Sequence, residues 1–196
     1  MKAAKETEVK IRVSNRASVL ELLKRLNFTV CVPREFESNT LYDTDHEMLR
    51  NKGMLLRLRQ AGKNCVITWK GPNESGPYKV RPELETSIGS LETLDRILAQ
   101  LGYRASFRYE KYRTEFADKG GQGTVTFDET PIGDFLELEG PGEWIDETAR
   151  ALGFSSKDYV LDSYFGLYIV DCERRGVEPR NMVFASHSED GSRSAV

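Results

Sequence analysis

Cysteine and histidine are scarce in this chain of 196 residues. There are only two histidines, and the three cysteines are scattered at Cys31, Cys65 and Cys172. No Cys-x-x-Cys pair occurs, so we do not expect a zinc site built from thiolate or imidazole ligands. An odd number of dispersed thiols is typical of reduced cysteines, and we therefore expect a cytoplasmic protein.

The chain also lacks long apolar runs and an excess of basic charge. No window approaches the length of a membrane span, and the first residues lead into a predicted strand without an apolar signal region. The formal net charge is −3, so no global electrostatic field favours nucleic acid. We expect neither membrane nor nucleic acid as a partner, and any bound anion must be held by a local cluster of bases.

The order of the predicted elements indicates one domain over residues 1–176. Alternating polarity predicts strands at 5–13, 28–42, 54–61, 65–71, 78–88, 104–116, 124–128 and 134–140. Apolar stripes and capping residues predict helices at 15–26, 90–102, 143–152 and 163–175, with a short helix or turn at 44–52. Residues 177–196 are Ser-rich and without periodicity, so we expect a disordered tail.

Charged residues alternate with apolar residues in strand after strand. Glu6, Glu8 and Lys10 share one face of the first predicted strand, and the same alternation returns at Arg57 and Arg59. Any one such strand fits a solvated outer face. Because the pattern recurs, we expect an α+β fold: a closed eight-stranded antiparallel β-barrel with an ionic interior and with helices packed on the outside.

The charged residues suit a metal–polyphosphate ligand. Paired carboxylates without histidine or thiolate favour Mg²⁺ or Mn²⁺, and guanidinium and ammonium groups match phosphate oxygens. The acids are Glu6, Glu8, Glu83, Glu85, Asp128, Glu137 and Glu139, and the bases are Arg57, Arg59, Lys70, Arg81, Lys111 and Arg113. An internal salt-bridge network without a ligand is the alternative, which we rank lower because buried ion pairs seldom repay their desolvation.

A glycine-rich segment at 119–123 does not indicate a phosphate-binding loop. It lacks the Lys-Ser/Thr pair of a phosphate-binding loop and lies between two predicted strands. We therefore predict a hairpin turn there.

Several motifs together resemble the CYTH superfamily, also called triphosphate tunnel metalloenzymes. Glu6-Thr7-Glu8-Val9-Lys10 matches the Glu-x-Glu-x-Lys signature of that family. The motifs that follow in the family's order are Leu56-Arg57-Leu58-Arg59, Thr68-Trp69-Lys70-Gly71, Glu83-Leu84-Glu85, Lys111-Tyr112-Arg113, Phe127-Asp128 and Phe135-Leu136-Glu137-Leu138-Glu139-Gly140. The resemblance covers roughly residues 5 to 170, and the Lys-x-Arg pair is similar to that of the class IV adenylyl cyclase-like branch.

The resemblance implies roles for individual residues in a triphosphate tunnel. The implied metal ligands are Glu6, Glu8, Glu137 and Glu139, helped by Asp128 and Glu85. The expected triphosphate contacts are Lys10, Arg57, Arg59, Lys70, Arg81 and Arg113. Lys111 resembles a phosphate or ribose contact of the cyclase branch, and Lys111 and Arg113 are the candidate catalytic residues.

Three functions remain open at this point. The leading hypothesis is a metal-dependent class IV-type adenylate cyclase that converts ATP to cyclic AMP and pyrophosphate. The second is a triphosphatase that hydrolyses thiamine triphosphate or inorganic tripolyphosphate. The third is a binder of nucleotide or polyphosphate without catalysis, which the many carboxylates disfavour. The expected partner is thus a small-molecule triphosphate, and the cyclase branch suggests a homodimer.

Overall fold

The computed structural model describes residues 4–185, which form one closed sheet with helices around it. The strands are β1 (Ala4–Val13), β2 (Thr29–Asp43), β3 (Leu55–Ala61), β4 (Asn64–Lys70), β5 (Lys79–Ser87), β6 (Arg104–Ala117), β7 (Thr124–Thr130), β8 (Gly133–Glu139) and β9 (Tyr159–Val160). The helices are α1 (Arg16–Arg25), α2 (Met48–Asn51), α3 (Leu91–Gln100), α4 (Gly142–Ala151), the 3₁₀ helix η1 (Ser156–Asp158) and α5 (Tyr164–Arg175). Within residues 4–185, no helix combines the length and apolarity needed to cross a membrane.

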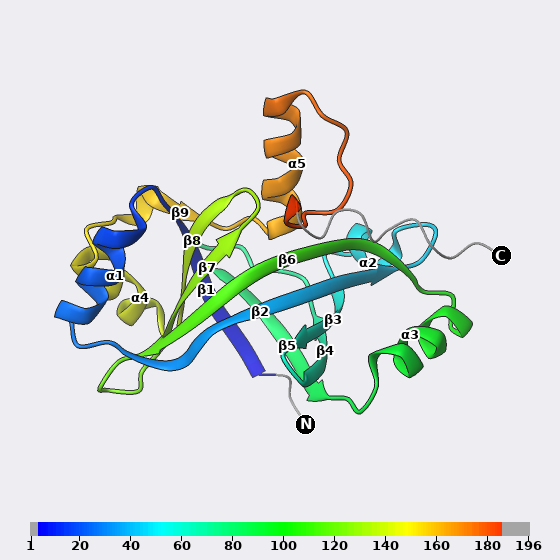
Figure 1. The fold of residues 1–196 in the computed structure, drawn as a ribbon, viewed down its shortest axis with the longest axis horizontal. Coiled ribbons are helices and arrows are strands. Elements are labelled where there is room, and N and C mark those ends of the chain that lie inside the picture. The colour runs from blue at the N-terminus through cyan, green and yellow to red at the C-terminus, as the bar shows by residue number, and fades with distance from the viewer. Residues whose placement is uncertain (1–3, 186–196) are drawn as a thin grey trace.

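The first eight strands close into an antiparallel barrel (Figure 1). Their order is β5-β4-β3-β2-β6-β7-β8-β1, and β1 returns to β5 through the pairs Glu6↔Arg81 and Glu8↔Lys79. The predicted eight-stranded barrel is thereby confirmed. The two residues of β9 add to the edge of β1 beyond its pairing with β5, and a strand this short leaves no alternation in the sequence.

The helices lie outside the barrel, where their caps fix them. Side chains of Asn15, Ser90 and Ser163 accept hydrogen bonds from backbone N–H groups in the first turns of α1, α3 and α5. Figure 1 shows α1 and α4 at one end of the barrel, α3 at the opposite end and α5 standing on a third side.

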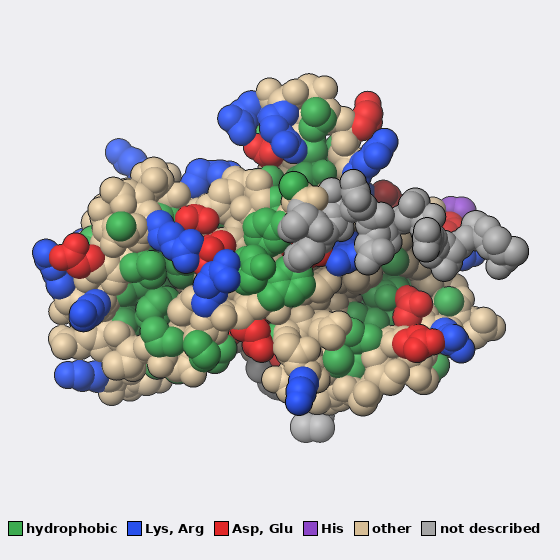
Figure 2. Space-filling view, viewed as in Figure 1, with side chains coloured by type: hydrophobic (Ala, Val, Ile, Leu, Met, Phe, Trp, Pro, Cys, Tyr) green, Lys and Arg blue, Asp and Glu red, His purple; other side chains and the backbone are tan. Residues whose placement is uncertain are grey.

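The apolar core lies between the barrel and these helices. Val9 and Ile11 of β1 are fully buried, as are Leu136 of β8, Leu23 of α1 and Ile145 of α4. Strand alternation then forces the opposite side chains, which are charged, into the lumen. On the outer face in Figure 2, acidic and basic side chains are interspersed among apolar ones.

The glycine-rich segment joins β6 to β7, as the prediction of a hairpin turn required. A Cβ atom at Gly123 would lie 2.5 Å from the Trp144 ring and 2.6 Å from the Glu139 backbone oxygen. Close packing against α4, and not phosphate binding, thus accounts for this glycine.

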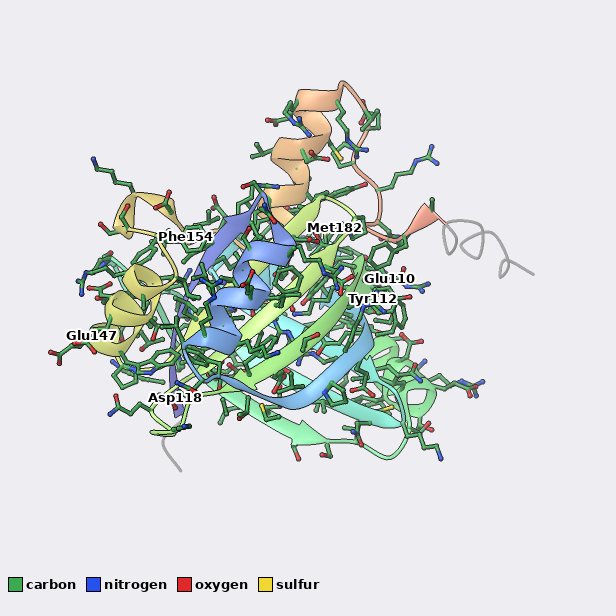
Figure 3. All side chains as sticks on the ribbon, turned by 60° about the vertical axis from the view of Figure 1, so that its left-hand side comes forward. Glu110, Tyr112, Asp118, Glu147, Phe154 and Met182 are labelled. Atoms are coloured by element: carbon green, nitrogen blue, oxygen red, sulfur yellow. The ribbon has the colours of Figure 1, made fainter. Side chains whose placement is uncertain are left out.

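Residues 177–185 differ from the expected disordered tail. They run along β6, where Met182 N–H donates to the Arg108 oxygen and Met182 O accepts from the Glu110 N–H, both at 2.9 Å. Met182 is fully buried, and Figure 3 shows it beside Glu110 and Tyr112. The edge of β6 beyond its pairing with β7 provides this docking place. The rest of the expected tail, 186–196, lies outside the described residues.

Candidate functional site

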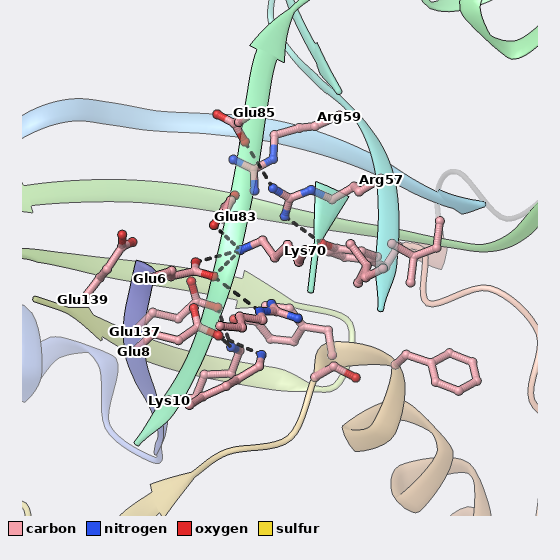
Figure 4. A pocket seen from close by; sticks show the side chains of 18 of the residues that line it. Glu6, Glu8, Lys10, Arg57, Arg59, Lys70, Glu83, Glu85, Glu137 and Glu139 are labelled. Carbon is pink, nitrogen blue, oxygen red and sulfur yellow. Dashed lines mark hydrogen bonds and ion pairs between the residues drawn. The ribbon is translucent and has the colours of Figure 1, made fainter. Parts of the chain in front are cut away.

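The lumen encloses a cavity of about 610 Å³, large enough for one small ligand. Figure 4 shows the carboxylates of Glu6, Glu8, Glu137 and Glu139 on one side of the cavity, away from Arg57 and Arg59. The predicted site residues that line it are Glu6, Glu8, Lys10, Arg57, Arg59, Lys70, Arg81, Glu85, Lys111, Arg113, Glu137 and Glu139. Asp128 alone among the predicted residues does not.

Glu6 anchors the first ion-pair cluster, where β1 meets β4 and β5. The Lys70 ammonium donates to both Glu6 oxygens at 2.6 and 2.7 Å, and Arg81 Nε donates at 3.4 Å. Lys70 also contacts Glu83 at 2.9 Å. Glu6, Lys70 and Arg81 are almost completely buried, so each charge depends on the others for compensation.

A second cluster surrounds Glu8 and Lys10. The Glu8 carboxylate accepts from Lys79 at 2.7 Å and from Lys10 at 3.0 Å, while Lys10 reaches Glu137 at 3.1 Å. Burial alone would raise the pKa of Glu8, but Lys10 and Lys79 hold it well below its usual range. Burial and the nearby Lys10 charge lower the pKa of Lys79 to about 8.

Glu139 is the uncompensated acid of the site. The register of β1 and β8 places it opposite Glu8, and no hydrogen bond or ion pair reaches its carboxylate from residues 4–185. The side chain is partly open to solvent. Desolvation, followed by repulsion from Glu6 and Glu8, raises the pKa of Glu139 to about 7. A cation at this position would remove that repulsion.

Arginines from β3 form the opposite wall. Arg57 donates to the Thr68 hydroxyl at 3.0 Å, which donates to Glu85 at 2.7 Å. Arg59 donates from Nε to Asn39 Oδ1 at 3.1 Å and lies 3.5 Å from the Glu37 carboxylate. Both arginines line the cavity, and guanidinium groups are well suited to binding phosphate oxygens.

Asp128 does not line the cavity but binds Lys111 and Arg113, which do. It is fully buried and accepts from Lys111 at 2.8 Å, from Arg113 at 2.6 and 2.7 Å and from the Tyr164 hydroxyl at 2.6 Å. Arg113 also contacts Glu137. With its oxygens shared among three donor side chains, Asp128 orients Lys111 and Arg113, which differs from the metal-ligand role expected for it.

The remaining acids fit a divalent cation by their chemistry, although their arrangement is not that of a preformed metal site. Their oxygens are the hard ligands that Mg²⁺ and Mn²⁺ prefer. Among residues 4–185, however, no three Asp, Glu, His or Cys side chains already cluster around one metal position. The carboxylates of Glu6 and Glu8 already form ion pairs with lysines, whereas the charge of Glu139 is uncompensated. The donor set thus accommodates a cation if Glu139 and its neighbours turn towards it.

The structure adds residues that sequence reasoning did not place in the site. Lys79, Tyr109 and Tyr164 line the cavity, and Glu37 is buried beside it. Lys79 shares the strand parity of Arg81, so its signal was present. Tyr164 comes from the first turn of α5, where no strand alternation exists to reveal it.

Two proteins named putative adenylate cyclase are similar to this chain, one in sequence and one in structure. A 26% identical Methanocaldococcus jannaschii protein, named "Putative adenylate cyclase MJ0240", matches over 83% of this chain and 97% of its own. The structure of a "putative adenylate cyclase" from Vibrio parahaemolyticus superimposes with a TM-score of 0.75 and 24% identity, covering 85% of this chain and 98% of that one.

A Hippeastrum protein, HpAC1, superimposes with a TM-score of 0.61 at 16% identity, over 89% of this chain and 97% of its own. It is described as a "putative adenylyl cyclase" with a dominant triphosphatase activity. Across the chain itself, the family model of the CYTH domain matches residues 4–164, the span that forms the barrel and reaches Tyr164. The chain therefore belongs to the CYTH domain family.

Proposed function

We propose that this protein is a metal-dependent enzyme that acts on a triphosphate held in the barrel lumen, and that it converts ATP to cyclic AMP and pyrophosphate. The observation that carries the proposal is one cavity of about 610 Å³ with Arg57 and Arg59 on one wall and a group of carboxylates, interleaved with lysines, on the other side. The adenylate cyclase name of the M. jannaschii relative supports the choice of ATP.

In this reaction the basic residues bind and orient the triphosphate chain. Arg57, Arg59 and Lys70 contact its oxygens, which aligns the α-phosphorus with the ribose hydroxyl that attacks it. Lys111 and Arg113, held in place by Asp128, compensate the charge that develops as pyrophosphate leaves.

The carboxylates on β1 and β8 complete the site. Glu8, Glu137 and Glu139 would hold Mg²⁺ or Mn²⁺, which supplies Lewis-acid stabilisation of phosphoryl charge and makes a bound hydroxyl more acidic. Glu6 has a different part, since it fixes the ammonium of Lys70 at 2.6 Å.

Hydrolysis of thiamine triphosphate or tripolyphosphate is the second candidate. Glu139 lines the cavity and is open to solvent, so water has access to a phosphoryl group bound there. Water would then attack the terminal phosphorus in place of a ribose hydroxyl at the α-phosphorus, and the same basic residues would stabilise the departing diphosphate.

Product identification tests the proposal. Purified protein is incubated with ATP, thiamine triphosphate or tripolyphosphate, each with Mg²⁺ or Mn²⁺. Cyclic AMP as the main product supports the cyclase, whereas orthophosphate as the main product from any of these substrates supports the hydrolase. Binding of all three without turnover would overturn both and leave a binding protein.

A further inference from the structure

Asn39 lies on β2, next to Arg59 in the lumen wall. The sheet register pairs it with Arg59 of β3 on one side and with Tyr109 of β6 on the other. Its side chain is fully buried, on the lumen-facing side of the strand, two residues after Glu37. Asn39 therefore supports the wall that Arg59 presents to the cavity and does not itself line that cavity.

The side chain of Asn39 makes an asymmetric set of contacts. Its Oδ1 accepts a hydrogen bond from Nε of Arg59 at 3.1 Å, whereas its Nδ2 is buried without a hydrogen-bond partner among residues 4–185. Arginine has only donors, so the amide must present its oxygen to Arg59. The unpaired Nδ2 is a consequence of that orientation, and it destabilises the fold. Stability alone thus gives no reason for an amide here.

The charge of Arg59 explains why position 39 carries an amide and not a carboxylate. Arg59 forms an ion pair with Glu37 at 3.5 Å, and no other ion pair of Arg59 occurs within residues 4–185. A carboxylate at position 39 would satisfy Nε equally well, but it would also place a second negative charge against the guanidinium. That charge would compete with an anionic ligand for Arg59. The amide provides an acceptor of the same shape without this competition.

We propose that Asn39 is a positioning residue of the anion site: it fixes the Arg59 guanidinium without cancelling its charge. The positive charge of Arg59 is then available to the triphosphate, so the assignment rests on the proposed function. Glu37 and Asn39 have different roles, because Glu37 supplies a negative charge beside Arg59 and Asn39 supplies orientation only.

Isothermal titration with tripolyphosphate tests this assignment in the full-length protein. Asn39→Asp keeps the acceptor and adds a charge, so tripolyphosphate should bind at least about tenfold more weakly while the melting temperature stays equal or rises. Asn39→Leu removes the acceptor and should also weaken binding about tenfold. The double variant Glu37→Gln/Asn39→Asp restores the count of negative charges and should return the affinity to within about threefold of wild type.

Ser38→Asp is the matched control, since this substitution adds the same charge on the opposite face of β2, outside the lumen. Its affinity should stay within about threefold of wild type. Asn39→Asp with wild-type affinity would overturn the assignment, provided that Arg59→Ala weakens binding. If wild-type protein bound no triphosphate at all, the proposed function would fall and this assignment with it. Should Asn39→Leu fail to fold, the near-isosteric Asn39→Asp decides the question.

Discussion

Inside the barrel, single charged side chains are held at positions that water hardly reaches. Lys111 is 1% exposed and Asp128 is 0% exposed, yet each retains its charge partner at 2.8 Å. Removing one member of such a pair leaves the other uncompensated, which typically costs about 3–5 kcal/mol. Substitutions in the lumen therefore affect stability as well as binding, and the two effects have to be measured separately.

The substitution Glu139→Gln should separate the effect on stability from the effect on activity. Because this carboxylate is repelled by Glu6 and Glu8 and has no partner within residues 4–185, neutralising it should leave the melting temperature unchanged or higher. Metal-dependent turnover should fall by about 100-fold or more, as expected for loss of a metal ligand. Initial rates with Mg²⁺ and a thermal melt, both compared with wild type, check the two halves. Full activity would remove Glu139 from the metal site.

The lowered pKa of Glu37 makes the stability of the fold depend on pH. Burial alone would raise its pKa, but Lys111 and Arg113 lower it from 4.5 to about 2. The ionised carboxylate thus stabilises the fold fully above pH 4.5, and this contribution is lost as the pH falls towards 2.

Wild type should therefore be more stable than Glu37→Gln at pH 7, by on the order of 3 kcal/mol, and the difference should shrink through that acid range. Urea unfolding at a series of pH values measures the difference. A gap that stays constant down to pH 2 would contradict the assignment of this pKa.

A lumen residue could be predicted from the sequence where charged and apolar residues alternate along its strand. Glu6 and Glu8 alternate with apolar residues, so their common face is visible in the sequence. Around Glu37 and Asn39 the intervening residue is Ser38, so both faces of β2 are polar there and alternation gives no signal. Asp128 was recognised as an acid of the site, but only the structure shows that its oxygens are taken by three donor side chains.

At the scale of elements, β6 joins the site to both of its neighbours in the fold. It carries Lys111 and Arg113 inward, pairs with β2 along its length, and docks residues 177–185 along part of its other edge. The long strands and amphipathic helices were predictable because their patterns persist over many residues. The docked segment was not, since Met182 is a single apolar anchor in a polar stretch without periodicity.

Met182→Ala should therefore destabilise the whole protein. The side chain is fully buried against Phe107 and Tyr168 in the core beneath α5, so its truncation should cost about 2–5 kcal/mol. Val177→Ala, at a side chain that is 48% exposed, is the control and should cost less than about 1 kcal/mol. Chemical denaturation of the three proteins provides the comparison. Equal stabilities would mean that residues 177–185 contribute little to the fold.

At the scale of the whole molecule, the fold brings acidic and basic residues from many strands into one cavity. The closed topology was predictable from the recurrence of alternation, whereas the pairing of individual ions was not. Partner choice depends on strand register, such as Lys10 opposite Glu137 and Glu8 opposite Lys79. Register arises from contacts between distant strands, which a single sequence does not display.

A ligand in this cavity should stabilise the entire barrel. Tripolyphosphate at about 100 times its dissociation constant should add about 2.7 kcal/mol and raise the melting temperature by about 5–10 °C. Differential scanning fluorimetry with and without Mg²⁺ measures the shift, and sulfate at equal ionic strength is the control. No shift at millimolar tripolyphosphate would favour the internal salt-bridge network without a ligand.

The main apolar core lies between the barrel and its helices, so the charged side chains of the lumen are largely separate from the apolar packing. Here a change of specificity requires only that ionic side chains of similar size be exchanged in matched pairs. Such a scaffold is suited to evolving new anion-processing activities in the laboratory, with charge balance as the rule that variants must obey.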